Sequence, residues 1–271
     1  MIRDMSLSKH TQALLAAYQH RQPLDAHPSA NPAPDPSAGP IGSAEAYAVQ
    51  RAVWQALAGN VRPTAWKVAA AGPGEMPMAA PILPQRLLNG TLNAPAKLPV
   101  QTLIRPGIEA EIAVRFGRDL PPRATPYQPA EIRAAIADLC VTMEVVDSRL
   151  ADPQAAGPDW RLADHLLNGA LVVGTTIRDW QDLRLDDLLV RVRAGGQVLA
   201  NRTGTQPLGD LFHCLPWFIA HIGGVHAGDV VTTGAWTGKH PLEGLARVPF
   251  VCEVEFSDMT KALGSVSLTL N

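Results

Sequence analysis

Apolar residues recur at helical spacing twice near the start of the chain, and this pattern predicts two helices. The first stripe lies within residues 1–21 and the second lies between residues 46 and 57. Ser43 is expected to cap the second helix, Glu45 suits its first turn, and Gly59 is expected to end it.

The segment between the two stripes, residues 21–43, is dominated by Pro, Ala and Ser. Proline lacks a backbone N–H and fixes its own φ, so it interrupts both helices and sheets. We therefore expect a long surface connection without regular structure.

From residue 64 onward, short apolar runs bounded by Gly, Pro and Asn indicate strands. Helical spacing returns in residues 128–140 and 209–224. The last part of the chain alternates and turns like a set of antiparallel strands. The predicted strands include residues 64–70, 108–116 and 170–174 and the terminal segments 226–236, 248–258 and 264–271.

This order of elements predicts an α+β fold in two parts. A small N-terminal helical α/β part would occupy residues 1–98, and a larger β-rich catalytic body would occupy residues 99–271. With 271 residues and 46% hydrophobic content, the chain is long enough to bury a substantial core.

Charge and cysteine content narrow the classes of partner. The formal net charge is -2 and there is no Lys/Arg-rich run, so nothing favours nucleic acid or an anionic membrane, and a small molecule is the better default partner. No apolar run approaches the roughly 18 residues of a membrane-spanning helix, and the first residues lack the long apolar run of a signal peptide. Three widely spaced cysteines are expected to be buried thiols in a cytoplasmic protein: Cys140, Cys214 and Cys252.

The first candidate for chemistry is a pair of glutamates in a predicted strand. The two-residue period of a strand places Glu109 and Glu111 on one face and the apolar residues between them on the other. Two carboxylates this close suit a divalent cation with oxygen ligands. A wet acidic face on an edge strand would explain the same pattern equally well.

Glu144 and Lys67 interrupt two other apolar runs. An ionised carboxylate at position 144 would cost several kcal/mol unless it is paired or bound to a cation. Pairing with nearby Arg149 is the alternative, and we favour the cation because two other carboxylates require one. A partly buried Lys67 could pair with a substrate carboxylate, or transfer a proton if its pKa is lowered. The alternative is a lysine whose stem packs along apolar surface while its ammonium group reaches water.

Weaker candidates for binding the substrate lie in two further segments. Asp164 and Asn168 are four residues apart and would share a helix face. They could contact the substrate directly, or they could cap the helix and support the residues that do. Thr233, Gly234 and Thr237 belong to a Gly- and Thr-rich loop whose N–H and hydroxyl groups could grip a carboxylate. Loops of this composition are usually only loops.

Taken together, several segments resemble the 2-oxopent-4-enoate hydratase and oxalocrotonate decarboxylase group of the fumarylacetoacetate hydrolase superfamily. The resemblance runs in order from about residue 47 onward, and its most specific part is the glutamate pair followed by EVVDSR. The matching segments are AYAVQ (46–50), AWKVA (65–69), RPGIEAEIAVRFGRDLP (105–121), MEVVDSRL (143–150), DHLLNGALVVG (164–174) and GDVVTTGAWTG (228–238).

The resemblance implies a Mg²⁺ or Mn²⁺ site formed by Glu109, Glu111 and Glu144, with Lys67 close to the metal. It also implies a body of rolled mixed sheets and a homo-oligomer. The family usually carries a PDYG-like stretch with a proton-transferring acid after the WK segment. This chain has AGPGEMPMAAP there, so Glu75 is the only candidate for that acid.

The implied activity is metal-dependent hydration of a small unsaturated 2-oxo acid, such as 2-hydroxypenta-2,4-dienoate, in aromatic or related catabolism. Decarboxylation and acylpyruvate-type C–C hydrolysis are alternatives, because all three reactions share a metal-stabilised enolate. A noncatalytic oxo-acid-binding protein or partner subunit is a further alternative, because the usual acid is absent.

Overall fold

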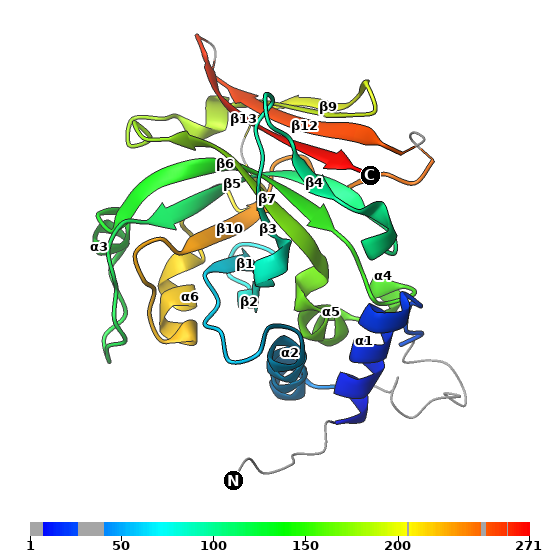
Figure 1. Cartoon of the computed structure of the whole chain (residues 1–271). Coiled ribbons are helices and arrows are strands. Elements are labelled where there is room, and N and C mark those ends of the chain that lie inside the picture. The colour runs from blue at the N-terminus through cyan, green and yellow to red at the C-terminus, as the bar shows by residue number, and fades with distance from the viewer. Residues whose placement is uncertain (1–7, 27–40, 205, 245–247, 259) are drawn as a thin grey trace.

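The computed structural model describes residues 8–26, 41–204, 206–244, 248–258 and 260–271, and it consists of two stacked β-sheets with helices beside the larger one (Figure 1). Apolar side chains from both sheets form one core between them. Strand β13 (Ala262–Leu270) packs against β6 (Ile136–Val146) and β7 (Asn168–Ile177) of the larger sheet. A Cβ at Gly174 would lie 2.3 Å from the backbone oxygen of Ser265, so only glycine fits there.

The larger sheet is mixed and has the strand order β2-β1-β10-β5-β6-β7-β3, with β11 paired to β5. Strands β1 and β10 pair in parallel, as do β3 and β7, and the other pairs are antiparallel. The strands are β1 (Ala65–Ala69), β2 (Met78–Pro81), β3 (Leu87–Asn89), β5 (Gly107–Phe116), β6 (Ile136–Val146), β7 (Asn168–Ile177), β10 (Val230–Ala235) and β11 (His240–Pro241).

The smaller sheet has the order β4-β13-β12-β8-β9. It contains β4 (Ala96–Leu98), β8 (Leu189–Ala194), β9 (Gln197–Thr203), β12 (Phe250–Ser257) and β13 (Ala262–Leu270). The two final segments form the predicted antiparallel pair β12–β13, whereas the segment before them, predicted to join this set, is β10 of the larger sheet. Alternation indicates that a segment is a strand, but only the fold selects its partners.

Helices α1 (Lys9–His20), α2 (Ser43–Ala58) and α5 (Pro158–Ala163) gather below the larger sheet in Figure 1 and share a second apolar cluster. Both predicted N-terminal helices are present, and α2 ends at Gly59 as expected. Its N-cap is Gly42 rather than Ser43, which is the first helical residue. Of the predicted connection 21–43, residues 27–40 lie outside the described residues.

The two later helical predictions were too long. In residues 128–140, α3 covers only Pro129–Arg133, and Ile136 already begins strand β6. In residues 209–224, α6 covers Leu215–Ile222, with a proline in its first turn. Tertiary pairing along β5 and β7 overrides the local helical pattern at the start of β6.

Two further sequence predictions concern the whole chain. In the part of the chain that the structure describes, no helix has both the length and the apolar character that crossing a membrane requires. Cys140, Cys214 and Cys252 are buried and unbridged, as expected. Strands β1 to β3, before the predicted boundary at residue 98, pair within the larger sheet, and that boundary stays a prediction.

Candidate metal centre

Three glutamate side chains meet on one face of the larger sheet. Glu109 of β5 lies directly opposite Glu144 of β6, and Glu111 is one alternation further along β5. One carboxylate oxygen from each residue lies within 4.8 Å of the others. The apolar residues between them point into the core between the sheets, as the alternation predicted.

Lys67 projects toward this triad from β1. Its Nζ lies 2.8 Å from Glu144 Oε2 and 3.9 Å from Glu109 Oε2. Burial by itself lowers the pKa of Lys67, but the three carboxylates outweigh burial and raise the pKa above its usual value. The carboxylates thus favour the ionised form of Lys67, in contrast to the lowered pKa considered from the sequence.

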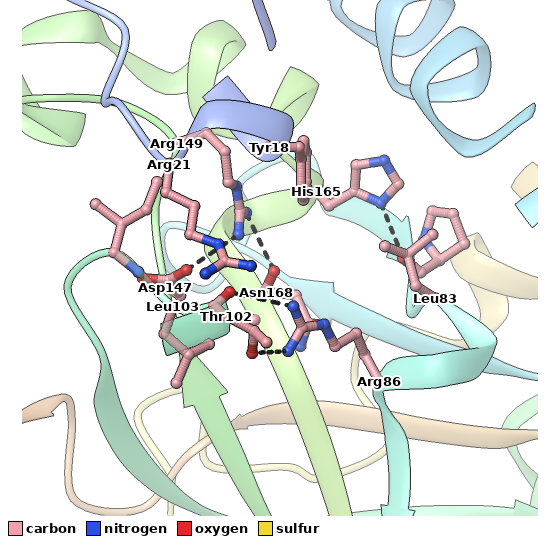
Figure 2. Close-up of a pocket in the computed structure, with 13 residues that line it drawn as sticks. Tyr18, Arg21, Leu83, Arg86, Thr102, Leu103, Asp147, Arg149, His165 and Asn168 are labelled. Atoms are coloured by element: carbon pink, nitrogen blue, oxygen red, sulfur yellow. Dashed lines mark hydrogen bonds and ion pairs between the residues drawn. The ribbon is translucent and has the colours of Figure 1, made fainter. Parts of the chain in front are cut away.

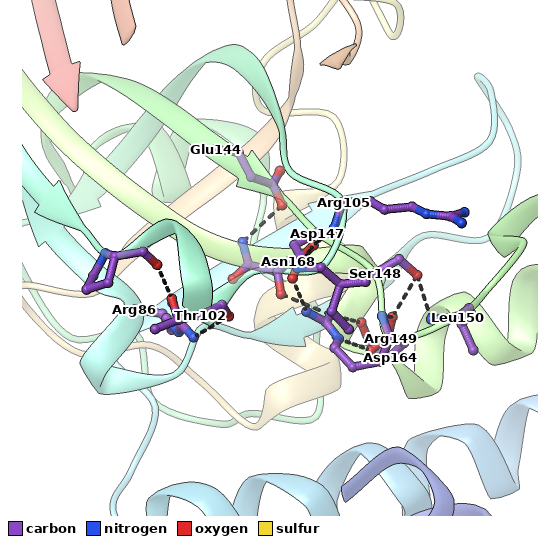
Figure 3. A network of polar contacts seen from close by, with 12 residues as sticks. Arg86, Thr102, Arg105, Glu144, Asp147, Ser148, Arg149, Leu150, Asp164 and Asn168 are labelled. Carbon is purple, nitrogen blue, oxygen red and sulfur yellow. Dashed lines mark hydrogen bonds and ion pairs between the residues drawn. The ribbon is translucent and has the colours of Figure 1, made fainter. Parts of the chain in front are cut away.

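Glu144 does not pair with Arg149, the alternative that the sequence left open. Its Oε1 instead accepts a hydrogen bond of 2.9 Å from Asn168 Nδ2 (Figure 3). The Arg149 guanidinium lies on Asp164, with Nε 2.5 Å from Oδ1. Each of these two buried carboxylates thus has its own partner.

Asp164 and Asn168 do not share a helix face, which corrects the sequence prediction. Helix α5 ends before Asp164, and the chain then passes through the left-handed region at His165, Leu166 and Leu167, with φ of 52°, 53° and 63°. This conformation costs non-glycine residues roughly 1–2 kcal/mol each. It turns Asp164 toward Arg149, while Asn168 begins β7 beside Glu144.

The acidic centre carries more negative charge than its surroundings neutralise. Among the described residues, neither oxygen of Glu111 has a hydrogen-bond partner, although the side chain is fully buried. Burial and the nearby Glu144 raise the pKa of Glu111 well above its usual value. In the part of the chain that the structure describes, Lys67 is the only ion-pair partner of the three carboxylates, and the oxygens of Glu111 fit a divalent cation, which prefers oxygen ligands.

A pocket of about 400 Å³ opens onto Lys67, Glu109 and Glu111. The residues that line it also include Thr233, Gly234 and Thr237, which the sequence placed in a loop. The β10–β5 pairing is interrupted between Thr232 and Ala235, and Gly234 has a φ of 128°, a conformation that favours glycine. Thr233 and Gly234 therefore lie within β10 and not in the predicted loop after it, and the irregular end of this strand borders the acidic centre.

The sequence did not predict two polar residues of this pocket, Arg202 and Gln206. Arg202 is an exposed residue of β9 in the smaller sheet, and Gln206 is buried in the loop that follows. Neither lies in a motif, and only the stacking of the two sheets brings them near Lys67. Arg202 is the second cationic side chain on the pocket wall.

Four of the predicted site residues are not among the residues that line this pocket. Glu144 contacts Lys67, and Asn168 contacts Glu144, but neither lines the pocket wall. Glu75 lies exposed on the loop between β1 and β2, outside the residues that line the pocket. Asp164 is fully buried and committed to Arg149, so it supports the structure around the centre.

Comparison with known proteins gives matches to one family. Residues 68–267 match the family model described as fumarylacetoacetate (FAA) hydrolase C-terminal. The 2-keto-4-pentenoate hydratases of Paraburkholderia phymatum and Burkholderia vietnamiensis are 30% and 32% identical over 142 residues. These matches cover 51% of this chain and 53% of each relative, so they span about half the length of the curated relatives.

The fold is also that of solved structures. The 4-oxalocrotonate decarboxylase of Pseudomonas putida G7, complexed with magnesium and adipate, superposes with a TM-score of 0.74 at 20% identity. The comparison covers 100% of this chain and 99% of that chain. The same enzyme complexed with calcium and acetate gives a TM-score of 0.73. The predicted rolled mixed-sheet fold is therefore confirmed.

Proposed function

The chain belongs to the fumarylacetoacetate hydrolase family, and from this membership and its acidic centre we propose that it is a divalent-metal-dependent hydratase of small unsaturated 2-oxo acids. A compound such as 2-hydroxypenta-2,4-dienoate is the proposed substrate. The buried, under-neutralised triad of Glu109, Glu111 and Glu144 carries the proposal. The hydratase names of the sequence relatives support the choice of reaction.

The three glutamates would hold Mg²⁺ or Mn²⁺. Carboxylate oxygens are the ligands that these ions prefer, and magnesium and calcium are present in the structural neighbours. When bound, the ion supplies a Lewis acid that polarises the 2-oxo group of the acid and stabilises negative charge on its enolate. Asn168 orients Glu144 through its side-chain amide.

The remaining groups of the pocket would bind and orient the substrate. Lys67 is positioned to attract the substrate carboxylate and to transfer a proton at its Nζ. The hydroxyls of Thr233 and Thr237 and the backbone of Gly234 line the wall where the rest of the acid would lie. Glu75 lies outside this wall, so a proton-transfer role for it would require a shift of its loop.

Decarboxylation of a dicarboxylic 2-oxo acid is the second candidate reaction. Arg202 adds a second cation to the pocket wall, which would suit a distal carboxylate. The decarboxylase neighbour is complexed with adipate, a dicarboxylate. C–C hydrolysis of an acylpyruvate would use the same acidic centre. The remaining candidate is a noncatalytic oxo-acid-binding protein or partner subunit, which is favoured by the position of Glu75 outside the pocket wall.

Turnover of two substrates tests the proposal. We expect 2-hydroxypenta-2,4-dienoate to lose its ultraviolet absorbance in the presence of Mg²⁺ or Mn²⁺, and EDTA to stop the reaction. Release of carbon dioxide from 4-oxalocrotonate, without turnover of the monocarboxylate, would instead establish the decarboxylase. A metal-dependent rise in melting temperature with no turnover of either compound would contradict both the hydratase and the decarboxylase. It would favour the noncatalytic oxo-acid-binding protein.

Replacing Lys67 separates chemistry from metal binding. We expect Lys67→Met to lower kcat by roughly 10²- to 10⁴-fold, the usual contribution of a positioned proton-transfer group. The same variant should bind Mg²⁺ at least as tightly, because a cation that competes for Glu144 is removed. Lys97→Met on β4, whose lysine is exposed, is the control. An unchanged kcat in Lys67→Met would refute the proposed role.

A further inference from the structure

A second, smaller cavity lies apart from the acidic pocket, between α1, the chain before β5 and the start of β7. Its volume is about 100 Å³. Figure 2 shows the guanidinium groups of Arg21, Arg86 and Arg149 directed toward the same space. Its lining residues and those of the acidic pocket have no member in common.

The carboxylates around this cavity are largely committed elsewhere. Asp164 binds the Nε of Arg149. Asp147 Oδ1 accepts hydrogen bonds of 3.0 and 2.7 Å from the backbone N–H groups of Ile104 and Arg105, and its Oδ2 lies 3.7 Å from Arg149 Nη1. Arg149 is thus the cation that these two acids neutralise.

The other two arginines have no carboxylate at ion-pair distance among the described residues. Arg86 donates only to the hydroxyl and the backbone oxygen of Thr102, at 2.8 and 3.2 Å. Arg21 is exposed at the rim of the cavity, and no hydrogen bond or ion pair joins its guanidinium to another described residue. Burial and the like charges of Arg149 and Arg21 lower the pKa of Arg86, and the Asp147 carboxylate on the cavity wall opposes this shift only in part.

Tyr18 adds an unused donor to the same wall. Its hydroxyl oxygen is shielded from solvent and has no hydrogen-bond partner among the described residues. Its ring packs against Arg149, whose Cζ lies 4.5 Å from the ring centroid. Burial raises the pKa of Tyr18, so the hydroxyl keeps its proton and remains able to donate. Buried donors without acceptors require an explanation, and a bound acceptor supplies one.

We propose that this cavity is a binding site for one small oxyanion group, a carboxylate or a phosphate, held by Arg21, Arg86 and the hydroxyl of Tyr18. The planar fork of each guanidinium matches the paired oxygens of such a group. At roughly 30 Å³ for each water molecule, the cavity has room for about three waters, which also suits a carboxylate or a phosphate group.

Asn168 connects the proposed anion site to the acidic centre, because it contacts a residue of each. Arg149 Nη2 donates to the Asn168 backbone oxygen, and the Asn168 side chain donates to Glu144, as Figure 3 shows. The anion site nevertheless has its own donors, so it does not rest on the proposed metal or on the proposed hydratase reaction. It can therefore be tested in protein that is stripped of metal.

The experiment measures binding of inorganic phosphate and of acetate to the full chain in EDTA and chloride buffer, by calorimetric titration and by melting temperature at constant ionic strength. We expect saturable binding of at least one anion, and the comparison of the two distinguishes phosphate from carboxylate. Arg86→Gln and Arg21→Gln should each weaken binding at least about 10-fold, because each removes a charged donor. Arg184→Gln, at an arginine 82% exposed on the surface, should leave binding unchanged.

Two results would overturn the proposal. The first is the absence of saturable binding of either anion to the wild-type chain, a measurement that needs no variant to fold. The second is equal binding by Arg21→Gln, Arg86→Gln and Arg184→Gln, which would mean that the anions bind by general charge attraction. Far-ultraviolet circular dichroism of each variant distinguishes loss of anion binding from loss of the folded structure.

Discussion

Replacing Glu111 with Gln is expected to abolish the response to divalent metal and, in metal-free protein at neutral pH, to raise the melting temperature. Loss of a single group that only supports a ligand costs about 10- to 100-fold in metal affinity, so loss of a ligand should cost at least about 100-fold. Calorimetric titration with Mg²⁺ and Mn²⁺ measures the first effect. Thermal unfolding in EDTA measures the second.

Glu111→Gln is expected to lower metal affinity but to raise metal-free stability, and both effects follow from the surroundings of Glu111. Its oxygens have no hydrogen-bond partner among the described residues, and burial and Glu144 raise its pKa. A carboxyl that binds its proton more tightly in the folded than in the unfolded chain destabilises the fold as pH rises above its unfolded pKa of about 4.3. Glutamine removes this penalty, so the stability advantage of Glu111→Gln in EDTA should grow as pH rises through that window.

The matched control is Glu253→Gln, which changes a partly exposed glutamate of β12 in the smaller sheet. It should alter neither metal affinity nor metal-free stability by a comparable amount. Undiminished Mg²⁺ binding by Glu111→Gln would remove this residue from the metal centre. A lower melting temperature in EDTA would show that Glu111 makes a stabilising contact instead.

Asp164→Asn is expected to destabilise the protein by about 3–5 kcal/mol, because it removes the closer carboxylate from the buried Arg149 charge and leaves only Asp147, at 3.7 Å. Both side chains are at most 3% exposed, and Asp164 accepts hydrogen bonds from the Arg149 backbone and side chain and from Ser148. Burial raises the pKa of Asp164 although Arg149 opposes this, so the pair depends on mutual neutralisation. Urea unfolding measures the free energy of unfolding.

The surface pair between Arg184 and Asp187 provides the comparison, since these side chains are 82% and 44% exposed. Asp187→Asn should cost less than about 1 kcal/mol. Adding Arg149→Met to Asp164→Asn should restore part of the lost stability, because it removes the unpaired charge. If Asp164→Asn costs no more than Asp187→Asn, the buried pair does not stabilise the fold in the way described.

The sequence by itself determined the features that depend on local periodicity. Alternation in β5 placed Glu109 and Glu111 on one face, and the apolar run around Glu144 marked a strand in which a carboxylate needs a partner. Helical spacing predicted α1 and α2, and segments that resemble the family in the same order predicted the family and its rolled-sheet fold. Side-chain direction within one strand or helix is fixed by backbone geometry, so no distant contact is needed to predict it.

Only the tertiary structure decided which of these residues meet. Asp164 and Asn168 were predicted to share a helix face, but a left-handed turn between them sends one to Arg149 and the other to Glu144. Arg202 reaches the pocket from the other sheet, whereas Glu75, close to Lys67 in sequence, stays outside it. Strand pairing and sheet stacking join residues far apart in the chain, and their energies depend on the whole packed core, which a local pattern does not contain.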